Sequence, residues 1–220
     1  MFTPPLKPRI KICCITTPGE AALAVHHGAA ALGFVSAMPS GPGVIDEQSI
    51  ATIVAGVPPG VGTFLLTAQV EVAAVAAQQR RTRVSVLQLC DRWPPGAHAE
   101  LRAALPGVGL VQVVHVIGEE SVAEAVAVAA AADALLLDSG NPRGAVKELG
   151  GTGRTHDWAL SRRIVDAVPV PVYLAGGLHA GNVAAAIAQV RPFGVDVCSG
   201  VRGPAGLDEE RLAAFVRAAG

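Results

Sequence analysis

The strongest constraint on the fold is an alternation that repeats eight times along 220 residues. Short runs of aliphatic and β-branched residues are each followed by an alanine-rich run with helical spacing. Short, continuously apolar strands are typical of a parallel sheet that is buried on both faces. The predicted strands cover residues 9–14, 31–35, 61–66, 84–89, 110–116, 134–138, 170–175 and 194–198, and the predicted helices cover 20–27, 46–54, 69–79, 97–104, 121–131, 159–168, 180–190 and 209–218.

Eight strand–helix units favour a closed barrel over an open doubly wound sheet, which usually has about five or six strands. No change of composition and no low-complexity linker marks a domain boundary. The sequence therefore predicts an α/β protein consisting of a single (β/α)8 barrel over residues 1–220. In such barrels the chemistry is carried by side chains at the carboxyl ends of the strands.

Charge and hydropathy exclude several classes of protein. Seventeen basic residues balance eighteen acidic ones, and no basic stripe predicts nucleic-acid binding. The most apolar stretch, 122–137, is interrupted by Glu124 and Asp133, whereas a membrane span needs about 18 apolar residues. Four cysteines are too few for a disulfide scaffold, which favours a reducing cytoplasm.

Glycine clusters follow the last three predicted strands. Backbone N–H groups in the loops after strands seven and eight of such barrels often bind phosphate, and glycine lets the backbone approach it closely. The purely structural alternative is that these glycines only terminate strands and helices. Together the clusters favour a small phosphorylated ligand contacted by Gly151, Thr152, Gly153, Gly176, Gly177, Ser199 and Gly200.

A possible acid–base pair ends two strands. Cys13 ends the first predicted strand and Asp138 the sixth. A thiolate can remove a proton from carbon, and a carboxylic acid can protonate a leaving oxygen. Strand alternation places Cys13 and Cys14 on opposite sides, so that only one faces the barrel mouth. A buried cysteine can equally be a small apolar side chain, and an aspartate a helix cap, and composition and spacing alone leave this open.

A metal site is not predicted, although soft ligands end several strands. Cys13, Cys90, Cys198 and His115 lie at the same end of the barrel, and such ligands would suit zinc. No paired spacing of the CxxC or HxxxH type accompanies them. Scattered small apolar side chains are the preferred interpretation.

Several segments, in order, resemble one family. Lys11–Thr16 is similar to KICGIT, and residues 31–35 are similar to the second strand of the same family. Residues 135–138 with 150–158 resemble LLD…GGTGxTFDW; residues 174–178 with Asn182 and Val183 resemble LAGGL..ENV, and residues 194–201 resemble GVDVSSGV. These are motifs of the phosphoribosylanthranilate isomerase family, and the ordered set spans nearly the whole chain.

The resemblance implies a single (β/α)8 barrel that catalyses an Amadori rearrangement in tryptophan biosynthesis without a cofactor. It implies that Cys13 is the general base and Asp138 the general acid. It also implies that Gly177, Ser199 and Gly200, with the 151–153 loop, hold the substrate phosphate. We expect a cytoplasmic monomer or homodimer.

Four departures from the family motifs cluster on the predicted active face. Gly43 stands where the family loop SPRY has an arginine that helps to hold the anthranilate, and a glycine cannot replace that planar cation. Cys90 replaces the histidine of QLHG, Cys14 replaces the glycine after the catalytic cysteine, and Arg202 follows SGV where the family is usually acidic. The candidates for the missing cation are Arg92, Arg143 and Arg202.

Three functional hypotheses follow from this mixture. The first is the isomerase itself, with relocated anthranilate contacts. The second is a diverged paralogue that isomerises a different phosphorylated sugar amine. The third is a non-catalytic barrel that binds a phosphorylated ligand. Retention of both Cys13 and Asp138 argues against the third, and the first is preferred.

Overall fold

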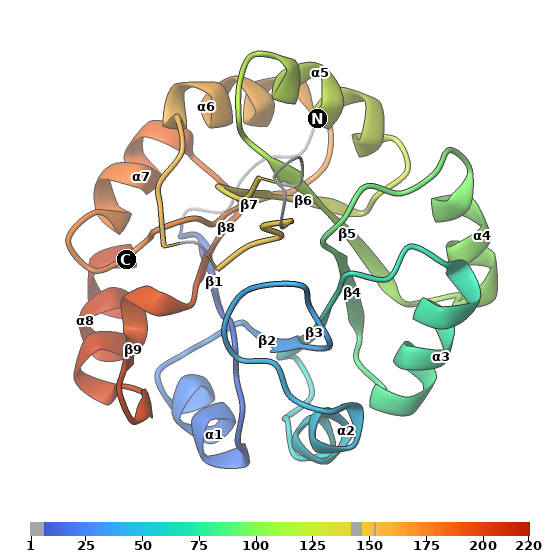
Figure 1. The fold of residues 1–220 in the computed structure, drawn as a ribbon. Helices are drawn as coiled ribbons and strands as arrows, with labels where there is room; N and C mark the ends of the chain where they lie inside the picture. Colours follow the sequence, from blue (N-terminus) through green and yellow to red (C-terminus); the bar gives the residue numbers. More distant parts are fainter. Residues whose placement is uncertain (1–6, 142–146, 152) are drawn as a thin grey trace.

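Parallel strands close into a barrel in the computed structural model, which describes residues 7–141, 147–151 and 153–220. Each strand pairs with its neighbours in sequence, and the eighth pairs with the first, as Figure 1 shows. The predicted barrel is confirmed. Its strands within the described ranges are β1 (Arg9–Ile12), β2 (Ala31–Val35), β3 (Gly62–Thr67), β4 (Val86–Leu89), β5 (Gly109–His115), β6 (Ala134–Asp138), β7 (Val172–Leu174) and β8 (Gly194–Val197).

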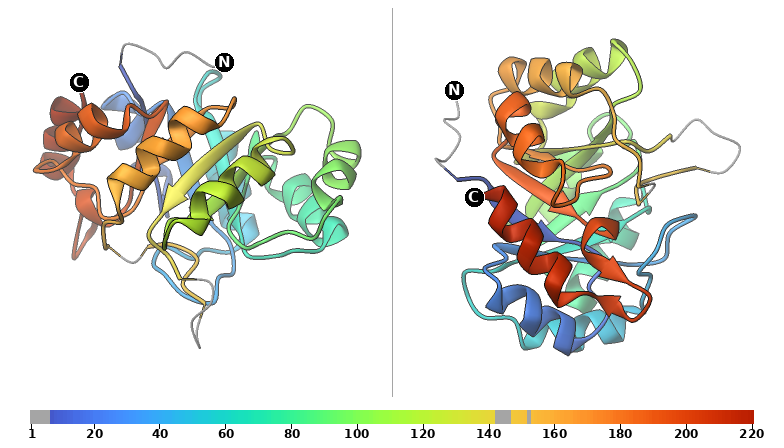
Figure 2. Two further views of the ribbon diagram at one scale, coloured as in Figure 1. Left: turned by 90° about the horizontal axis from the view of Figure 1, so that it is seen from above. Right: turned by 90° about the vertical axis from the view of Figure 1, so that its left-hand side faces the viewer.

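Helices surround the barrel, one after each strand, and form its outer layer (Figures 1 and 2). The described part of the chain contains α1 (Pro18–His26), α2 (Glu47–Ala55), α3 (Val72–Thr82), α4 (Ala97–Ala104), α5 (Glu120–Ala129), α6 (Trp158–Ala167), α7 (Val183–Val190) and α8 (Glu209–Ala219). A short 3-10 helix, η1 (Ser199–Val201), and a small hairpin of β9 (Arg202–Gly203) and β10 (Gly206–Leu207) precede α8 and were not predicted. None of the helices in the described ranges is long and apolar enough to cross a membrane.

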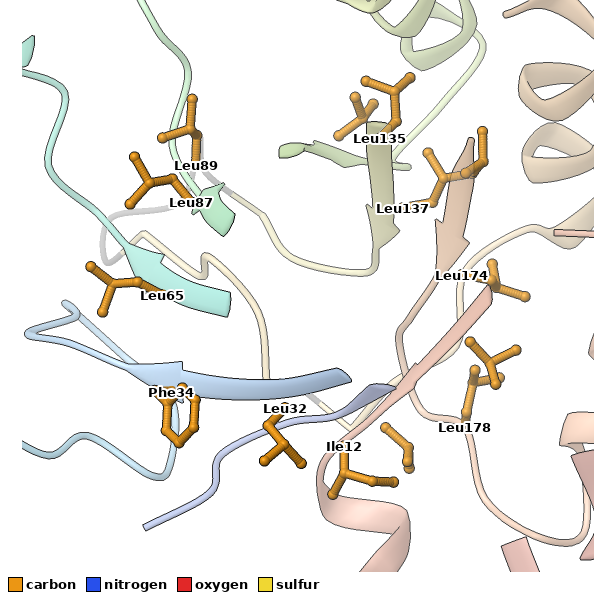
Figure 3. Packing of buried hydrophobic residues seen from close by; sticks show 14 of the residues in the cluster. Ile12, Leu32, Phe34, Leu65, Leu87, Leu89, Leu135, Leu137, Leu174 and Leu178 are labelled. Carbon is orange, nitrogen blue, oxygen red and sulfur yellow. The ribbon is translucent and has the colours of Figure 1, made fainter. Parts of the chain in front are cut away.

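Two apolar layers follow from the alternation of side chains along each strand. Figure 3 shows the outer layer, in which Leu32, Phe34 and Leu65 point away from the barrel axis toward the helices. The residues between them, such as Phe64 and Leu66, belong to a second cluster inside the barrel. The strands therefore read as continuous apolar runs because both of their faces are buried.

The strand bounds differ from the prediction by two residues at the first, fourth and seventh strands, and β4 begins at Val86 instead of residue 84. β1 ends at Ile12 instead of residue 14, because Cys14 has a φ of 62° and leaves the extended conformation. β7 covers only residues 172–174 of the predicted run 170–175. The first helix begins at a cap that the sequence contains, since Thr17 Oγ1 accepts the N–H of Glu20 at 3.1 Å.

Candidate active site

One cavity opens at the carboxyl ends of the barrel strands, where the predicted site lies. Cys13 and Asp138 both line it, and so do all the predicted glycines of the described residues except Gly200. The walls are completed by side chains from β2, β3, β4 and β8 and from the loops after β2 and β6. The remaining lining residues are Cys14, Val35, Met38, Ser40, Gly41, Pro42, Leu66, Gln88, Leu149, Gly150, Ala175, Leu178, Asp196, Val197, Cys198 and Ser199.

Asp138 is held at the end of β6 by closely packed backbone. Its Oδ1 accepts the N–H of Ser139 at 2.7 Å, and the residue is only 8% exposed. A Cβ atom on Gly150 would lie 2.8 Å from Asp138 Oδ2, and one on Gly176 would lie 3.2 Å from Oδ1. The two glycines thus let loop backbone pack against the carboxyl group, which faces the cavity rather than bulk water.

Cys13 lies next to a buried ion pair inside the barrel. Lys11, two residues earlier on the same side of β1, is fully buried, and its Nζ is 2.9 Å from Asp196 Oδ1 on β8. A Cβ atom on Gly33 would be 2.9 Å from Cys13 Sγ and 3.1 Å from Lys11 Nζ, so the thiol and the ammonium group share one small space.

The charge of Lys11 is fixed by its partners. Burial alone would lower the pKa of Lys11, but the charge and hydrogen bond of Asp196, together with the neighbouring thiols of Cys13 and Cys14, raise that pKa above its ordinary value. The ammonium group also lies 5.3 Å from the centre of the Phe64 ring. A permanent positive charge therefore stands beside Cys13.

Cys14 also lines the cavity, and the prediction that only one of the two cysteines faces it is wrong. The left-handed backbone at Cys14 breaks the strand alternation on which that prediction rested. A positive φ is uncommon for a residue other than glycine, which explains the glycine of the KICGIT motif at this position. Here the turn carries a buried thiol, whose pKa is raised by the neighbouring thiols of Cys13 and Cys198 and by burial.

Gly43 and Cys14 occupy one space. Gly43 has a φ of 80°, and a Cβ atom added to it would lie 2.6 Å from the Cβ of Cys14. An arginine at position 43 does not fit while Cys14 is present. The two departures from the family motifs, which the sequence presents as separate, are therefore one steric exchange.

The glycine loops after β6 and β7 converge with η1 at one end of the cavity. Gly151, Gly153, Gly176 and Gly177 all have positive φ between 61° and 83°. A Cβ atom on Gly177 would lie 2.7 Å from the backbone carbon of Arg154, so the second loop passes directly over the first. Neither loop could follow this path with side chains at these positions.

Ser199 adds a hydroxyl group to this end of the cavity. Its Oγ would be 3.8 Å from a Cβ atom on Gly153, and the residue begins η1. Gly200 lies one residue behind the cavity wall, where a Cβ atom would be 2.0 Å from the carbonyl oxygen of Leu178. Thr152, the other predicted phosphate contact, lies outside the described residues.

Of the three predicted replacement cations, the two that lie in the described part of the chain do not line the cavity. Arg92 lies on the outside between α4 and α5, where its Nε donates to Glu124 Oε1 at 2.8 Å. Arg202 is held by Glu20, at 2.8 and 2.9 Å, and donates to the carbonyl oxygen of Cys14. Arg202 thus positions the loop that carries Cys13 and Cys14. Arg143 lies outside the described residues.

Cys90 and His115 do not form a metal site with the other cysteines. Cys90 is fully buried, and burial raises the pKa of its thiol, which is therefore neutral. His115 Nε2 is 3.2 Å from the carbonyl oxygen of Cys90. Within the part of the chain that is described, no group of three or more His, Cys, Asp or Glu side chains is arranged to hold a metal ion.

Sequence reasoning missed the ion pair and the apolar wall. Lys11 stands two residues before Cys13 in an apolar strand, and Asp196 stands in another, which was a usable signal for a buried pair. Val35, Met38, Leu66 and Leu149 give the cavity an apolar wall. Residues this far apart in sequence carry no spacing that would have brought them together.

Comparisons with known proteins agree with this geometry. The family model described as N-(5'phosphoribosyl)anthranilate (PRA) isomerase matches residues 10–218. The N-(5'-phosphoribosyl)anthranilate isomerase of Methanocella arvoryzae is 37% identical over 193 residues, with 88% of each chain covered.

Two solved structures have the same architecture. One is phosphoribosyl anthranilate isomerase in complex with reduced 1-(o-carboxyphenylamino)-1-deoxyribulose 5-phosphate, with a TM-score of 0.81 and 27% identity over 96% of this chain and 98% of that one. The other contains monomers of the dimeric phosphoribosylanthranilate isomerase of Thermotoga maritima, with a TM-score of 0.80, 26% identity and the same coverage.

Proposed function

Since the chain belongs to the N-(5'-phosphoribosyl)anthranilate isomerase family, we propose that it catalyses the Amadori rearrangement of N-(5'-phosphoribosyl)anthranilate in tryptophan biosynthesis. The product is 1-(o-carboxyphenylamino)-1-deoxyribulose 5-phosphate. The observation that carries the proposal is one cavity with Cys13 and Asp138 on its walls and a glycine-built end for a phosphate.

Asp138 acts as the general acid in the first step. Its carboxyl group gives a proton to the ring oxygen of the furanose, the bond between C1' and that oxygen breaks, and the nitrogen lone pair forms a C1'=N iminium. Loop backbone shields the carboxyl group of Asp138 from solvent, so a bound ligand, instead of bulk water, accepts its proton.

Cys13 acts as the general base in the second step. Its thiolate removes the proton from C2', and the C–H electrons form a C1'=C2' double bond while the C1'=N electrons return to nitrogen. The enolamine then tautomerises to the ketone. The ammonium group of Lys11 supplies the positive charge that a thiolate base requires nearby.

The two ends of the substrate match the two ends of the cavity. The loops of Gly151, Gly153 and Gly177, with Ser199, hold the phosphate through backbone N–H groups and the start of η1. The apolar wall of Met38, Leu66 and Leu149 takes the aromatic ring. This apolar wall favours a substrate that carries an aryl amine. It argues against the alternative hypothesis, in which the substrate is a different phosphorylated sugar amine.

Other expectations remain predictions. Arg143 lies outside the described residues, and its contact with the anthranilate carboxylate stays a prediction. A cytoplasmic location and a choice between monomer and homodimer are also still predictions, although a dimeric relative exists.

Turnover and complementation test the proposal together. Wild-type protein should convert N-(5'-phosphoribosyl)anthranilate and restore growth of a tryptophan auxotroph that lacks the isomerase. Cys13→Ala and Asp138→Asn should each lower kcat by about 10²–10⁴-fold, because each removes one proton-transfer group.

Cys90→Ala is the matched control, because that thiol is buried outside the cavity wall. It should keep activity close to that of the wild type. Absence of growth with folded wild-type protein present in the cells would contradict the proposed substrate.

A further inference from the structure

Arg202 reaches from the hairpin after η1 back to the turn that carries the proposed general base. Its guanidinium donates to the carbonyl oxygen of Cys14 and also pairs with Glu20, with Nη1 2.9 Å from Oε1 and Nη2 2.8 Å from Oε2. Only 16% of the Arg202 side chain and 11% of the Glu20 side chain are exposed. A largely buried carboxylate therefore holds the planar guanidinium in one orientation, with one donor aimed at the turn.

The backbone on both sides of Cys14 is fixed to neighbouring strands. Cys13 donates its N–H to the carbonyl oxygen of Val197 on β8 at 2.8 Å, and Ile15 donates its N–H to that of Gly33 on β2 at 3.0 Å. Cys14, between them, makes the turn with a φ of 62°. A left-handed backbone costs free energy for a residue that has a Cβ atom, so Cys14 is under a strain that a glycine would not have.

Glu20 connects the same turn to the hairpin that carries Arg202. Its Oε2 accepts the N–H of Thr16 at 2.7 Å, and its Oε1 accepts the N–H of Leu207 at 2.8 Å. Arg202 and Glu20 therefore fasten the chain at two points, the carbonyl of Cys14 and the N–H of Thr16.

We propose that Arg202 is a positioning residue for the general base, which holds the carbonyl of Cys14 so that the turn stays left-handed and the Cys13 thiol stays in place. This inference rests on the proposed function, in which Cys13 removes the proton from C2'. Molecules in which Cys14 leaves the left-handed conformation turn over poorly, because the adjoining base is displaced. The value of kcat therefore follows the fraction of molecules that keep the turn.

Two departures from the family motifs fit this role together. Cys14 replaces the glycine of KICGIT, and Arg202 follows SGV where the family is usually acidic. An ionised acidic side chain only accepts hydrogen bonds and could not donate to the Cys14 carbonyl. A glycine turn does not need the donor, because glycine adopts the left-handed backbone as readily as the right-handed one. The effect of Arg202 on catalysis should therefore depend on the residue at position 14.

Steady-state kinetics of the wild type, Arg202→Met, Cys14→Gly and the double variant tests this dependence. Arg202→Met should lower kcat by about tenfold, because a residue with a Cβ atom disfavours the left-handed region by about that factor once the hold is lost. KM should change by less than about twofold, because the loops that hold the phosphate keep their residues. In the Cys14→Gly background the same substitution should lower kcat by less than about threefold. Equal falls in both backgrounds would overturn the proposal.

Arg211→Met is the matched control. Arg211 is an exposed arginine near the start of α8, and its Nη1 donates to the backbone carbonyl oxygen of Arg202. The substitution removes a cation from the same hairpin contact and leaves the Cys14 carbonyl with its donor. Its kcat should therefore stay within about twofold of the wild type.

Hydrogen exchange tests the hold without turnover and so separates it from the proposed function. The amides of Cys13, Ile15 and Thr16 should exchange at least about tenfold faster in Arg202→Met than in the wild type. In the Cys14→Gly background Arg202→Met should change their exchange by less than about threefold. The amides of β5 are the internal reference, because they exchange faster only if the whole barrel unfolds. Unchanged exchange of residues 13–16 in Arg202→Met would overturn the proposal even if kcat falls, whereas the expected pattern in an inactive wild type would contradict only the proposed function.

Discussion

The two ends of the cavity are built by different means. At the end formed by the loops after β6, β7 and β8, the walls are backbone, and Gly177 has no room for a side chain, because an added Cβ atom would lie 2.7 Å from the backbone carbon of Arg154. At the end formed around β1 and β2, the walls are side chains that contact one another. Cys14 packs on Gly43, and Lys11 pairs with Asp196.

The difference determines how each end can change. A backbone-built end depends on the absence of Cβ atoms. Replacing one of its glycines with another residue would therefore disturb the path of the loop. A side-chain-built end can change by paired replacement, because one side chain takes the volume that another gives up. The departures from the family motifs at Cys14 and Gly43 lie together at the second end, as this reasoning expects.

At the side-chain-built end, the largest loss of stability should come from breaking the ion pair of Lys11 and Asp196. Lys11→Met leaves Asp196 buried without a partner, which should lower the free energy of unfolding by about 3–5 kcal/mol. Urea denaturation measures this. Lys11→Met with Asp196→Asn should recover much of the loss. The exposed pair of Arg163 and Glu119 is the control, since Arg163→Met should cost less than about 1 kcal/mol. Equal losses in the buried and exposed pairs would contradict the comparison.

At the backbone-built end, an added side chain should collide with the neighbouring loop and lower activity. In Gly177→Ala the new Cβ atom would lie 2.7 Å from the backbone carbon of Arg154, so kcat/KM should fall on the order of a hundredfold as the phosphate loop is displaced. Steady-state kinetics measures the effect. Gly28→Ala is matched to it, because Gly28 has a φ of 86° with no atom within 4 Å of its added Cβ. Its backbone strain should cost about 1–2 kcal/mol of stability and leave the kinetics unchanged.

The steric exchange between positions 14 and 43 sharpens the comparison. Gly43→Ala should lower the free energy of unfolding by about 2 kcal/mol, because its Cβ atom would lie 2.6 Å from the Cβ of Cys14. In a Cys14→Gly background the same substitution should cost only about 1 kcal/mol, the strain of its positive φ. Thermal or urea unfolding of the four proteins gives the coupling energy. Additive effects would show that the two positions do not share one space.

The smallest effect is expected at acid pH. Burial alone would raise the pKa of Glu20, but hydrogen bonds from Arg202 and from the N–H groups of Thr16 and Leu207 lower it from 4.5 to about 2. A lowered folded-state pKa stabilises the protein above pH 4.5, and this stabilisation is lost as the pH falls through about 2.

Glu20→Gln should therefore reduce stability by about 1 kcal/mol near neutral pH, after allowance for solvent screening, and flatten its decline in acid. Unfolding curves between pH 6 and pH 2 test this. An unchanged slope in Glu20→Gln would show that the carboxylate is not held as the structure indicates. Arg202→Met should flatten the same decline, because it removes the main donor.

The fold was predictable because its signal is local and repeated. Each strand is apolar on both faces and each helix follows at once, so the alternation alone indicates a barrel. The end of β1 was not predictable by the same rule. A cysteine at Cys14 gives no sign of a left-handed backbone, and the family glycine at that position was the one available indication.

The site was predictable in its positions and less so in its contacts. Strand ends and glycine clusters located Cys13, Asp138 and the loops that line the cavity. The pairing of Arg202 with Glu20 depends on residues 182 positions apart, and nothing in their spacing indicates it. Arg202 consequently was a candidate for the substrate, although its charge is directed to the Cys14 loop.

The contact of Arg202 and Leu207 with Glu20 joins the first helix, α1, to the hairpin of β9 and β10. During synthesis on the ribosome Cys13, the proposed general base, emerges early, whereas Arg202 and Leu207 emerge near the end of the chain. The loop of Cys13 and Cys14 can therefore be fastened by Arg202 only after all eight strands of the barrel have been made.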